Sequence, residues 1–272
     1  IGLNAYGAAT IGIKNIVIGC VAMSGVTTGQ SDENIAIGTY ALTGNASTTG
    51  NRNIAIGYNT IAALTSGACN IAIGTNAADA LTTGTCNIAM GLNALGAATT
   101  GVNNIAIGEL AMGTGVTLVG GGACGCNNVA IGRSAASAIT LGTNNVAIGR
   151  LVADALTLGN NNIAMGVNAL GAATDTSDNI AIGRAALAVS IDGGEQNIAI
   201  GMTAMGGSDT AGDDNIAIGT NAADALLAGS CNIAMGLNAA GAMTIGISNI
   251  AIGRNAMSGV TTAQADNNIA IG

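Results

Sequence analysis

The sequence predicts an all-β fold, a parallel β-solenoid (β-roll) of about 15 coils. The pentapeptide Asn-Ile/Val-Ala-Ile/Met-Gly occurs fifteen times, with Val17 as the one replacement of its central Ala. Its closing glycines are 17 residues apart in nine of fifteen intervals, 18 or 19 apart in five and 24 apart in one. A fixed short period is the signature of a repeat architecture. Within the pentapeptide, large and small side chains alternate, as in a strand with one buried face.

The coil from Gly67 to Gly84 shows the expected order of elements. Residues 71–73 (Ile-Ala-Ile) form a strand, which Gly74 ends at a corner. A short apolar segment over residues 76–81 follows, and Gly84 marks a second corner. In the strand we expect both Ile side chains to point inward and the central Ala to point outward. Leucine-rich repeats also carry an Asn in each turn, but they need longer repeats and more Leu.

Composition restricts the kind of core that this chain can build. It has no Phe, Trp, Pro or His and only three Tyr, so it cannot fill a wide core. Stacked Ile, Leu, Met, Val and Ala fill a narrow one. We expect residues 1–272 to form a single repetitive solenoid and, because neither end shows a polar capping unit, to be a window of a longer fibrous protein.

The Asn that opens each pentapeptide predicts a ladder along the solenoid. Placed at one corner of every coil, its amide can bond the coils before and after it, as in stacked cross-β structures. A local turn at the same corner is a compatible second role. The predicted ladder consists of Asn15, Asn34, Asn53, Asn70, Asn87, Asn104, Asn128, Asn145, Asn162, Asn179, Asn197, Asn215, Asn232, Asn249 and Asn268.

The central Ala of the pentapeptide predicts a contact surface between chains. An outward column of Ala makes a flat apolar stripe that lets another chain approach closely, and contiguous apolar stripes mark interaction surfaces. The alternative is that small residues are simply tolerated there. The candidate face consists of Ala36, Ala55, Ala72, Ala89, Ala106, Ala130, Ala147, Ala164 and Ala181.

The cysteines and the acidic residues raise the questions of whether the chain forms a disulfide and whether it binds a metal ion. Three cysteines, Cys69, Cys86 and Cys231, directly precede a ladder Asn, where they either fill the stack or, for Cys69 and Cys86, approach within disulfide range. A zinc site is not expected without His. The acids gather at corners, such as Asp213 and Asp214, where solvated corners are the first interpretation and Ca²⁺ binding the second. We expect no resident metal and no cofactor.

The sequence does not indicate an enzyme. It lacks His, shows no paired carboxylates in an obvious cleft, and its Gly120-Gly121-Gly122 run does not continue into a phosphate-binding loop. The net charge of −8, with six Lys and Arg in total, argues against nucleic-acid binding. No apolar run approaches the length of a membrane helix, so we expect no membrane contact within residues 1–272.

Blocks of several coils recur above the single repeat. Residues 75–81 (Thr-Asn-Ala-Ala-Asp-Ala-Leu) return unchanged as residues 220–226, and residues 150–156 are a looser third copy. The longest interval, from Gly108 to Gly132, holds about seven extra residues that we expect to loop out. Duplicated blocks indicate that length itself is useful, and loops on a regular stack are places for contact with a partner.

The full motif stands at residues 100–108, Thr-Gly-Val-Asn-Asn-Ile-Ala-Ile-Gly, and an Ala follows three residues after the closing Gly. It resembles the head repeat of YadA-like trimeric autotransporter adhesins and the related repeats of phage tail fibres. The resemblance covers the whole sequence, although the adhesin repeat is nearer 14 residues. It implies a left-handed β-roll, a homotrimer and adhesion to a host or surface.

These observations predict a structural or adhesive fibre segment, the head or shaft of a surface adhesin or tail fibre. Its partners would be copies of itself and an unknown receptor, and its location extracellular, on a cell surface or virion. Two alternatives stay open: a self-assembling extracellular filament without a specific receptor, and, as a minor one, an ice-binding solenoid.

Overall fold

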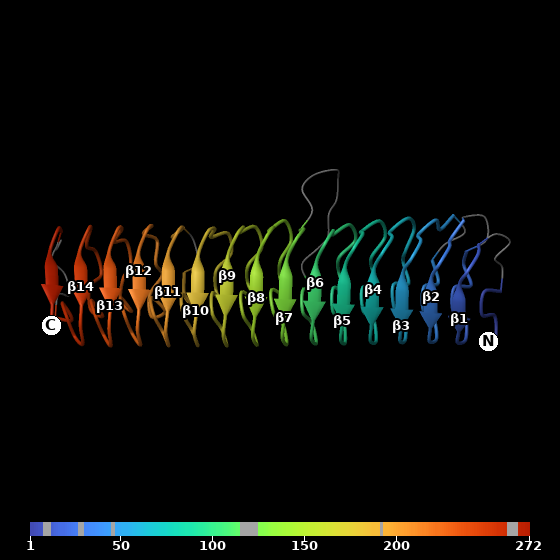
Figure 1. Cartoon of the computed structure of the whole chain (residues 1–272), viewed down its shortest axis with the longest axis horizontal. Coiled ribbons are helices and arrows are strands. Elements are labelled where there is room, and N and C mark those ends of the chain that lie inside the picture. Colours follow the sequence, from blue (N-terminus) through green and yellow to red (C-terminus); the bar gives the residue numbers. More distant parts are fainter. Residues whose placement is uncertain (8–11, 27–29, 45–46, 115–124, 191–192, 260–265) are drawn as a thin grey trace. The chain divides into compact units, whose positions relative to one another are not determined.

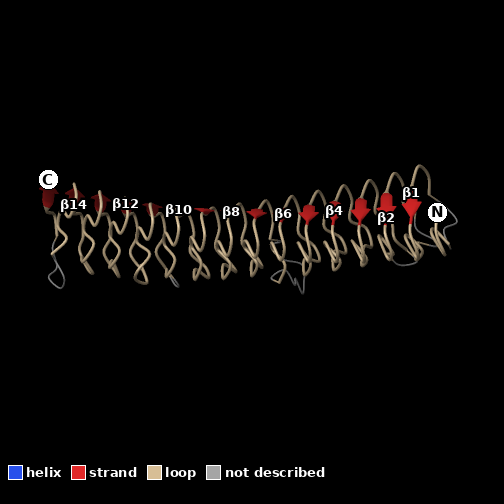
Figure 2. Cartoon of the chain, turned by 90° about the horizontal axis from the view of Figure 1, so that it is seen from below, coloured by secondary structure: helices blue, strands red, loops and turns tan. Residues whose placement is uncertain are grey.

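The computed structural model describes residues 1–7, 12–26, 30–44, 47–114, 125–190, 193–259 and 266–272. Within them the protein has fifteen three-residue strands and no helix, so the predicted all-β solenoid is confirmed. Each coil contributes one strand and a longer irregular return (Figures 1 and 2). The extra residues 115–124 of the longest interval lie outside the described part.

The chain divides into two compact units, residues 1–141 and 142–272. The first unit holds β1 (Ile16–Ile18), β2 (Ile35–Ile37), β3 (Ile54–Ile56), β4 (Ile71–Ile73), β5 (Ile88–Met90), β6 (Ile105–Ile107) and β7 (Val129–Ile131). The second holds β8 (Val146–Ile148), β9 (Ile163–Met165), β10 (Ile180–Ile182), β11 (Ile198–Ile200), β12 (Ile216–Ile218), β13 (Ile233–Met235), β14 (Ile250–Ile252) and β15 (Ile269–Ile271).

Consecutive strands within each unit pair in parallel and in register. In the first unit Ala55 lies opposite Ala36 and Ala72, and in the second Ala199 lies opposite Ala181 and Ala217. Each repeat position therefore forms a column that runs from coil to coil. A single coil of this size buries too little apolar surface to be stable by itself. The β-ladders and side-chain columns between coils therefore supply the stability, as in other repeat proteins.

The structure reverses the expected direction of the strand side chains. The central alanines point into the core of their own chain, while the flanking Ile and Met side chains stay partly exposed, as in β4. Every alanine of the predicted face is at most 1% exposed: Ala36, Ala55, Ala72, Ala89, Ala106, Ala130, Ala147, Ala164 and Ala181. The prediction that this column faces another chain is wrong.

Strand parity explains the reversal. Residues two apart in a strand share a face, so the ladder Asn and the central Ala must point the same way. Asn34, like Ala36, is 0% exposed, and inside the coil its side chain donates to the carbonyl of Gly50 and accepts from the backbone N–H of Asn53, both in the next coil. Ile35 and Ile37 are then left on the outer face. The large inward side chains come from the opposite wall of the coil, for example Leu42.

In several coils the residues of that opposite wall exchange large and small side chains three positions apart. In the coil of β4 a buried Ala78 precedes a buried Leu81, and in the coil of β5 a buried Leu95 precedes a buried Ala98. Such an exchange keeps the local side-chain volume of a close-packed core nearly constant. The same exchange occurs in Ala136 with Ile139, Ala153 with Leu156, Leu170 with Ala173, Ala223 with Leu226 and Ala240 with Met243. The coils of β1 and β3 instead bury two large residues at these positions, Met23 with Val26 and Ile61 with Leu64.

The corners depend on backbone that L-residues seldom adopt. Gly74 has φ +133°, and a Cβ there would lie 2.6 Å from the carbonyl oxygen of Gly91 in the next coil. Cys69, Asn76 and Ala78, in the same repeat, have φ of 60°, 53° and 50°. Left-handed residues persist where the surroundings fix them. Here the amide of Ala78 donates to the carbonyl of Ala94, one coil on, at 2.9 Å.

Candidate assembly face and polar groove

The ladder asparagines form a buried column of hydrogen bonds. The Nδ2 of Asn70 donates to Oδ1 of Asn53 at 3.0 Å and to the carbonyl of Gly84 at 2.9 Å. The Oδ1 of Asn70 in turn accepts from the backbone and side-chain nitrogens of Asn87, both at 3.0 Å. The side-chain amide of Asn70 is thereby joined to the coils before and after it. The column is structural, because its polar groups are already used between coils.

The outer face of the strands replaces the alanine column as the candidate assembly face. We call it the isoleucine face, formed by the first and third residues of each strand, and none of its side chains is buried. In the first unit it comprises Ile16, Ile18, Ile35, Ile37, Ile54, Ile56, Ile71, Ile73, Ile88, Met90, Ile105, Ile107, Val129 and Ile131. In the second it comprises Val146, Ile148, Ile163, Met165, Ile180, Ile182, Ile198, Ile200, Ile216, Ile218, Ile233, Met235, Ile250, Ile252, Ile269 and Ile271.

Sequence reasoning missed this face because it put the large residues inside. The signal that would have found it is the parity between the Asn and the Ala of the pentapeptide. Strand positions two apart are ~6.7 Å apart and neighbouring strands are ~4.8 Å apart, so the face presents a flat grid of apolar side chains. A contiguous apolar surface of this regularity marks an interaction site, unlike singly scattered exposed residues.

In the second unit the isoleucine face has borders of opposite charge. The two residues before each ladder Asn form the entry border, and the residue after each closing Gly forms the exit border. The entry border carries the exposed acids Asp178, Glu195, Asp213, Asp214 and Asp266 and no basic residue. The exit border carries the exposed Arg150, Arg184 and Arg254 and no acidic residue.

In the first unit the border charges are neutralised within the chain. Glu33 forms ion pairs with Lys14 at 3.0 Å and with Arg52 at 2.9 Å, along the entry border. The hydrogen bond from Arg52 is the main reason that the pKa of Glu33 is lowered, followed by that from Lys14. On the exit border Arg133 lies 3.6 Å from Glu109. Such exposed pairs contribute little stability.

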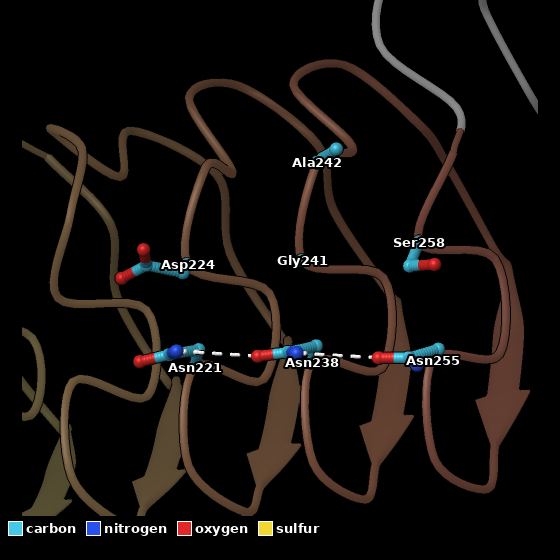
Figure 3. Close-up of a pocket in the computed structure, with 7 residues that line it drawn as sticks. All are labelled: Asn221, Asp224, Asn238, Gly241, Ala242, Asn255 and Ser258. Atoms are coloured by element: carbon cyan, nitrogen blue, oxygen red, sulfur yellow. Dashed lines mark hydrogen bonds between the residues drawn. The ribbon is translucent and has the colours of Figure 1, made fainter.

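A polar groove lies elsewhere on the second unit (Figure 3). It is a depression of about 400 Å³, lined by Asn221, Asp224, Asn238, Gly241, Ala242, Asn255 and Ser258. Three of these residues form a second, partly exposed ladder, in which the Nδ2 of Asn221 donates to Asn238 and that of Asn238 to Asn255, each at 3.2 Å. Amide, hydroxyl and carboxylate groups on one side of a hollow can hold a small polar molecule by hydrogen bonds.

Among the described residues that line this groove, Asp224 is the one ionisable group. Burial raises its pKa, and a hydrogen bond from the backbone of Gly207 opposes the shift. Its Oδ1 is buried and accepts no hydrogen bond among the described residues. The lining residues provide no second carboxylate and no base beside it, so the groove offers binding groups rather than an acid–base pair.

The three cysteines that precede a ladder Asn do not fill the stack. Cys69, Cys86 and Cys231 are free and exposed, and Cys20 is free and half-buried. Cys126 is disulfide-bonded, and Cys124 lies outside the described residues. Within the part of the chain that the structure describes, no three Cys, Asp or Glu side chains gather as a metal-binding group.

Comparisons with known proteins add no family to this picture. No protein-family model matches the chain, and no curated protein matches it in a sequence search. The likeness to YadA-like heads rests on the repeated motif. In the described ranges, no helix is both long and apolar enough to cross a membrane.

Proposed function

We propose that this chain is a structural and adhesive segment of an extracellular fibre, in which copies associate through the isoleucine face and loops contact an outside surface. The observation that carries the proposal is the unbroken grid of outward Ile, Val and Met side chains in each unit. Strand faces exposed to water usually carry polar residues. A face built from Ile in nearly every coil is explained by a partner that covers it.

The dimensions of the face suit a long partner. In the second unit eight strands spaced at ~4.8 Å make a face about 34 Å long. Full burial of an Ile side chain contributes about 1.5–3 kcal/mol. Each partly exposed Ile that a partner covers contributes part of this free energy to association. Because the same grid recurs in every coil, a second copy of the chain can match it coil for coil. Homo-oligomers that close by rotation are also the commonest assemblies.

The charged borders favour one orientation of the copies. If the rotation axis runs along the solenoid, the copies are parallel, and the entry border of one lies beside the exit border of the next. Asp178 then faces Arg184 of its neighbour at the same level. If the copies were antiparallel, acids would face acids across the contact. Opposite charges set register and orientation in this way. Two chains or three satisfy this rule, and the resemblance to trimeric adhesins favours three.

Association is tested by placing charge on the face. Ile163, Ile180 and Ile198, each replaced by Lys, should convert an oligomeric parent to monomers, because a lysine ammonium cannot be buried there unpaired. The outward direction of these side chains should leave the circular dichroism spectrum unchanged. Leu158→Lys with Leu227→Lys is the matched control, because both residues are exposed but lie off the face. Sedimentation velocity reads the result, and a monomeric parent overturns the proposal.

The filament without a receptor differs from the adhesive fibre only in what its loops bind. Adhesion of the labelled chain to cell layers, compared with that of a loop-deleted chain, separates the two. Deleting residues 115–122 should abolish adhesion and leave the oligomer intact. Equal adhesion by both chains would show that this loop does not mediate adhesion.

A further inference from the structure

Cys69 and Cys86 occupy the same repeat position in consecutive coils of the first unit. Both thiols are free and exposed, and the two residues have nearly the same φ, 60° and 59°. The amide of Cys69 donates to the carbonyl of Asn51 at 3.0 Å, and that of Cys86 to the carbonyl of Ala68 at 3.0 Å. The backbones therefore superpose coil on coil, with Cα atoms about 4.8 Å apart. This separation lies within the range that disulfides span.

Side chains at this repeat position reach one another between neighbouring coils. The entry-border column of the first unit contains the Lys14–Glu33 and Glu33–Arg52 contacts at 3.0 and 2.9 Å before the cysteines. After them, Asn103 donates to Asn127 at 3.2 Å. In the second unit Asn144 donates to Asn161 at 3.2 Å, and Asn161 to Asp178 at 3.0 Å. The column thus brings side chains of successive coils into direct contact wherever their lengths allow it.

We propose that Cys69 and Cys86 form a two-thiol site that small disulfides oxidise to a cross-link between adjacent coils. The thiolate of one cysteine attacks the sulfur–sulfur bond of a small disulfide, forms a mixed disulfide and releases one small thiolate. The second cysteine thiolate attacks the protein sulfur of that mixed disulfide and releases the other small thiolate. The two protein thiols lose two electrons and two protons in total, and the small disulfide is reduced to two thiols.

The reduced site has a second, diagnostic chemistry. Two thiols on adjacent coils can chelate a trivalent arsenical, since phenylarsine oxide and two thiols give a dithioarsinite and one water. The second arsenic–sulfur bond forms within the molecule, so its effective concentration is high. The pair should bind this probe more than about 100-fold more tightly than a single thiol.

Cys231 provides the matched control within the same chain. It occupies the same repeat position, with φ 59°, and its thiol is also free and exposed. Its neighbours in the column, however, are Asp214 and Ser248, neither of which carries a thiol. Ser248 has φ 59° and is close to cysteine in size, so Ser248→Cys supplies the missing partner with little disturbance.

The experiment treats the reduced full chain with glutathione disulfide and maps the modified peptides by mass spectrometry. Cys69 and Cys86 should be joined to each other, and Cys231 should carry glutathione. In Cys86→Ser, Cys69 should carry glutathione instead, and in Ser248→Cys the second unit should gain the cross-link. Phenylarsine oxide should protect Cys69 and Cys86, but not Cys231, from alkylation. Glutathione on both Cys69 and Cys86, or equal arsenical binding by Cys231, would overturn the proposal.

Discussion

Residues 75–81 and 220–226 have the same sequence but different surroundings. In the first copy, the Oδ2 of Asp79 lies 3.4 Å from the Nδ2 of Asn59, in the preceding coil. In the second copy, the equivalent residue of the preceding coil is Thr203, whose hydroxyl donates to Asn221. The Oδ1 of Asp224 is left buried without a donor in the described part of the chain. The chemistry of a repeat position is therefore set by the coil stacked on it, as nearest-neighbour behaviour requires.

The buried Asn ladder is the same in both copies. Substitutions in this ladder should therefore cause the largest loss of stability, and a similar loss in each unit. Asn70→Ala and Asn215→Ala should each destabilise their unit by about 3 kcal/mol or more, and by similar amounts. Each removes two side-chain donations and orphans the buried backbone N–H of the next ladder asparagine. Urea unfolding and hydrogen exchange of the neighbouring strands measure the loss. Asn103→Ala, at an exposed ladder and at φ 57°, is the control and should cost about 1 kcal/mol or less. Unequal losses would show that the two stacks differ beyond the groove.

The fold was predictable from the sequence, whereas the faces were not. The period and the alternation in residues such as Ile71-Ala72-Ile73 suffice for coils, strands and register, because both are local properties of the repeat. Which side is buried depends on where the amide of Asn70 is satisfied, a question about neighbouring coils. The prediction that the Ile side chains point inward was based on their hydrophobicity. In the structure the Asn side chains point inward instead, because their buried amides need hydrogen-bond partners. Large residues on the opposite wall then filled the core.

The groove was beyond sequence reasoning for a related reason. Asp79 and Asp224 are identical within their heptapeptides, and the coil before them distinguishes the two, with Asn59 in the first copy and Thr203 in the second. The 17–18-residue interval between Asn59 and Asn76, or between Thr203 and Asn221, hides this relation until the register is known. The spacing of the cysteine pair was predictable from the sequence, because the shared position before the ladder Asn places Cys69 and Cys86 one coil apart.

Exchanging the distinguishing residue should transfer the behaviour of one copy to the other. Thr203→Asn should stabilise the second unit by about 1 kcal/mol, because it supplies an amide donor for Asp224. It also places Asn, which tolerates φ near +53° better than a β-branched residue, at a left-handed position. Asn59→Thr should destabilise the first unit by a similar amount.

A double-mutant cycle separates the two contributions of Thr203→Asn. In an Asp224→Ala background the relief of backbone strain remains, but the hydrogen bond cannot form. The stabilisation should therefore fall by about half. If Thr203→Asn stabilised the Asp224→Ala chain by the same amount, backbone conformation alone would distinguish the two copies. Asp224 would then make no stabilising contact with residue 203.

The smallest expected effect is the pH dependence of the two carboxylates. Burial raises the pKa of Asp79 and of Asp224 in the folded chain, so each folded carboxyl binds its proton more tightly than the unfolded one. Stability should consequently fall as the pH rises through the unfolded pKa, near 3.9, toward the raised folded value, and the penalty persists above it. Both residues are only half-buried, so solvent screening limits the change to about a few tenths of a kcal/mol. Asp224→Asn should flatten the profile of the second unit more than Asp79→Asn flattens that of the first, because only Asp224 lacks a side-chain donor. Urea unfolding from pH 3 to 7 or so tests this order, and a larger change for Asp79→Asn would contradict the comparison.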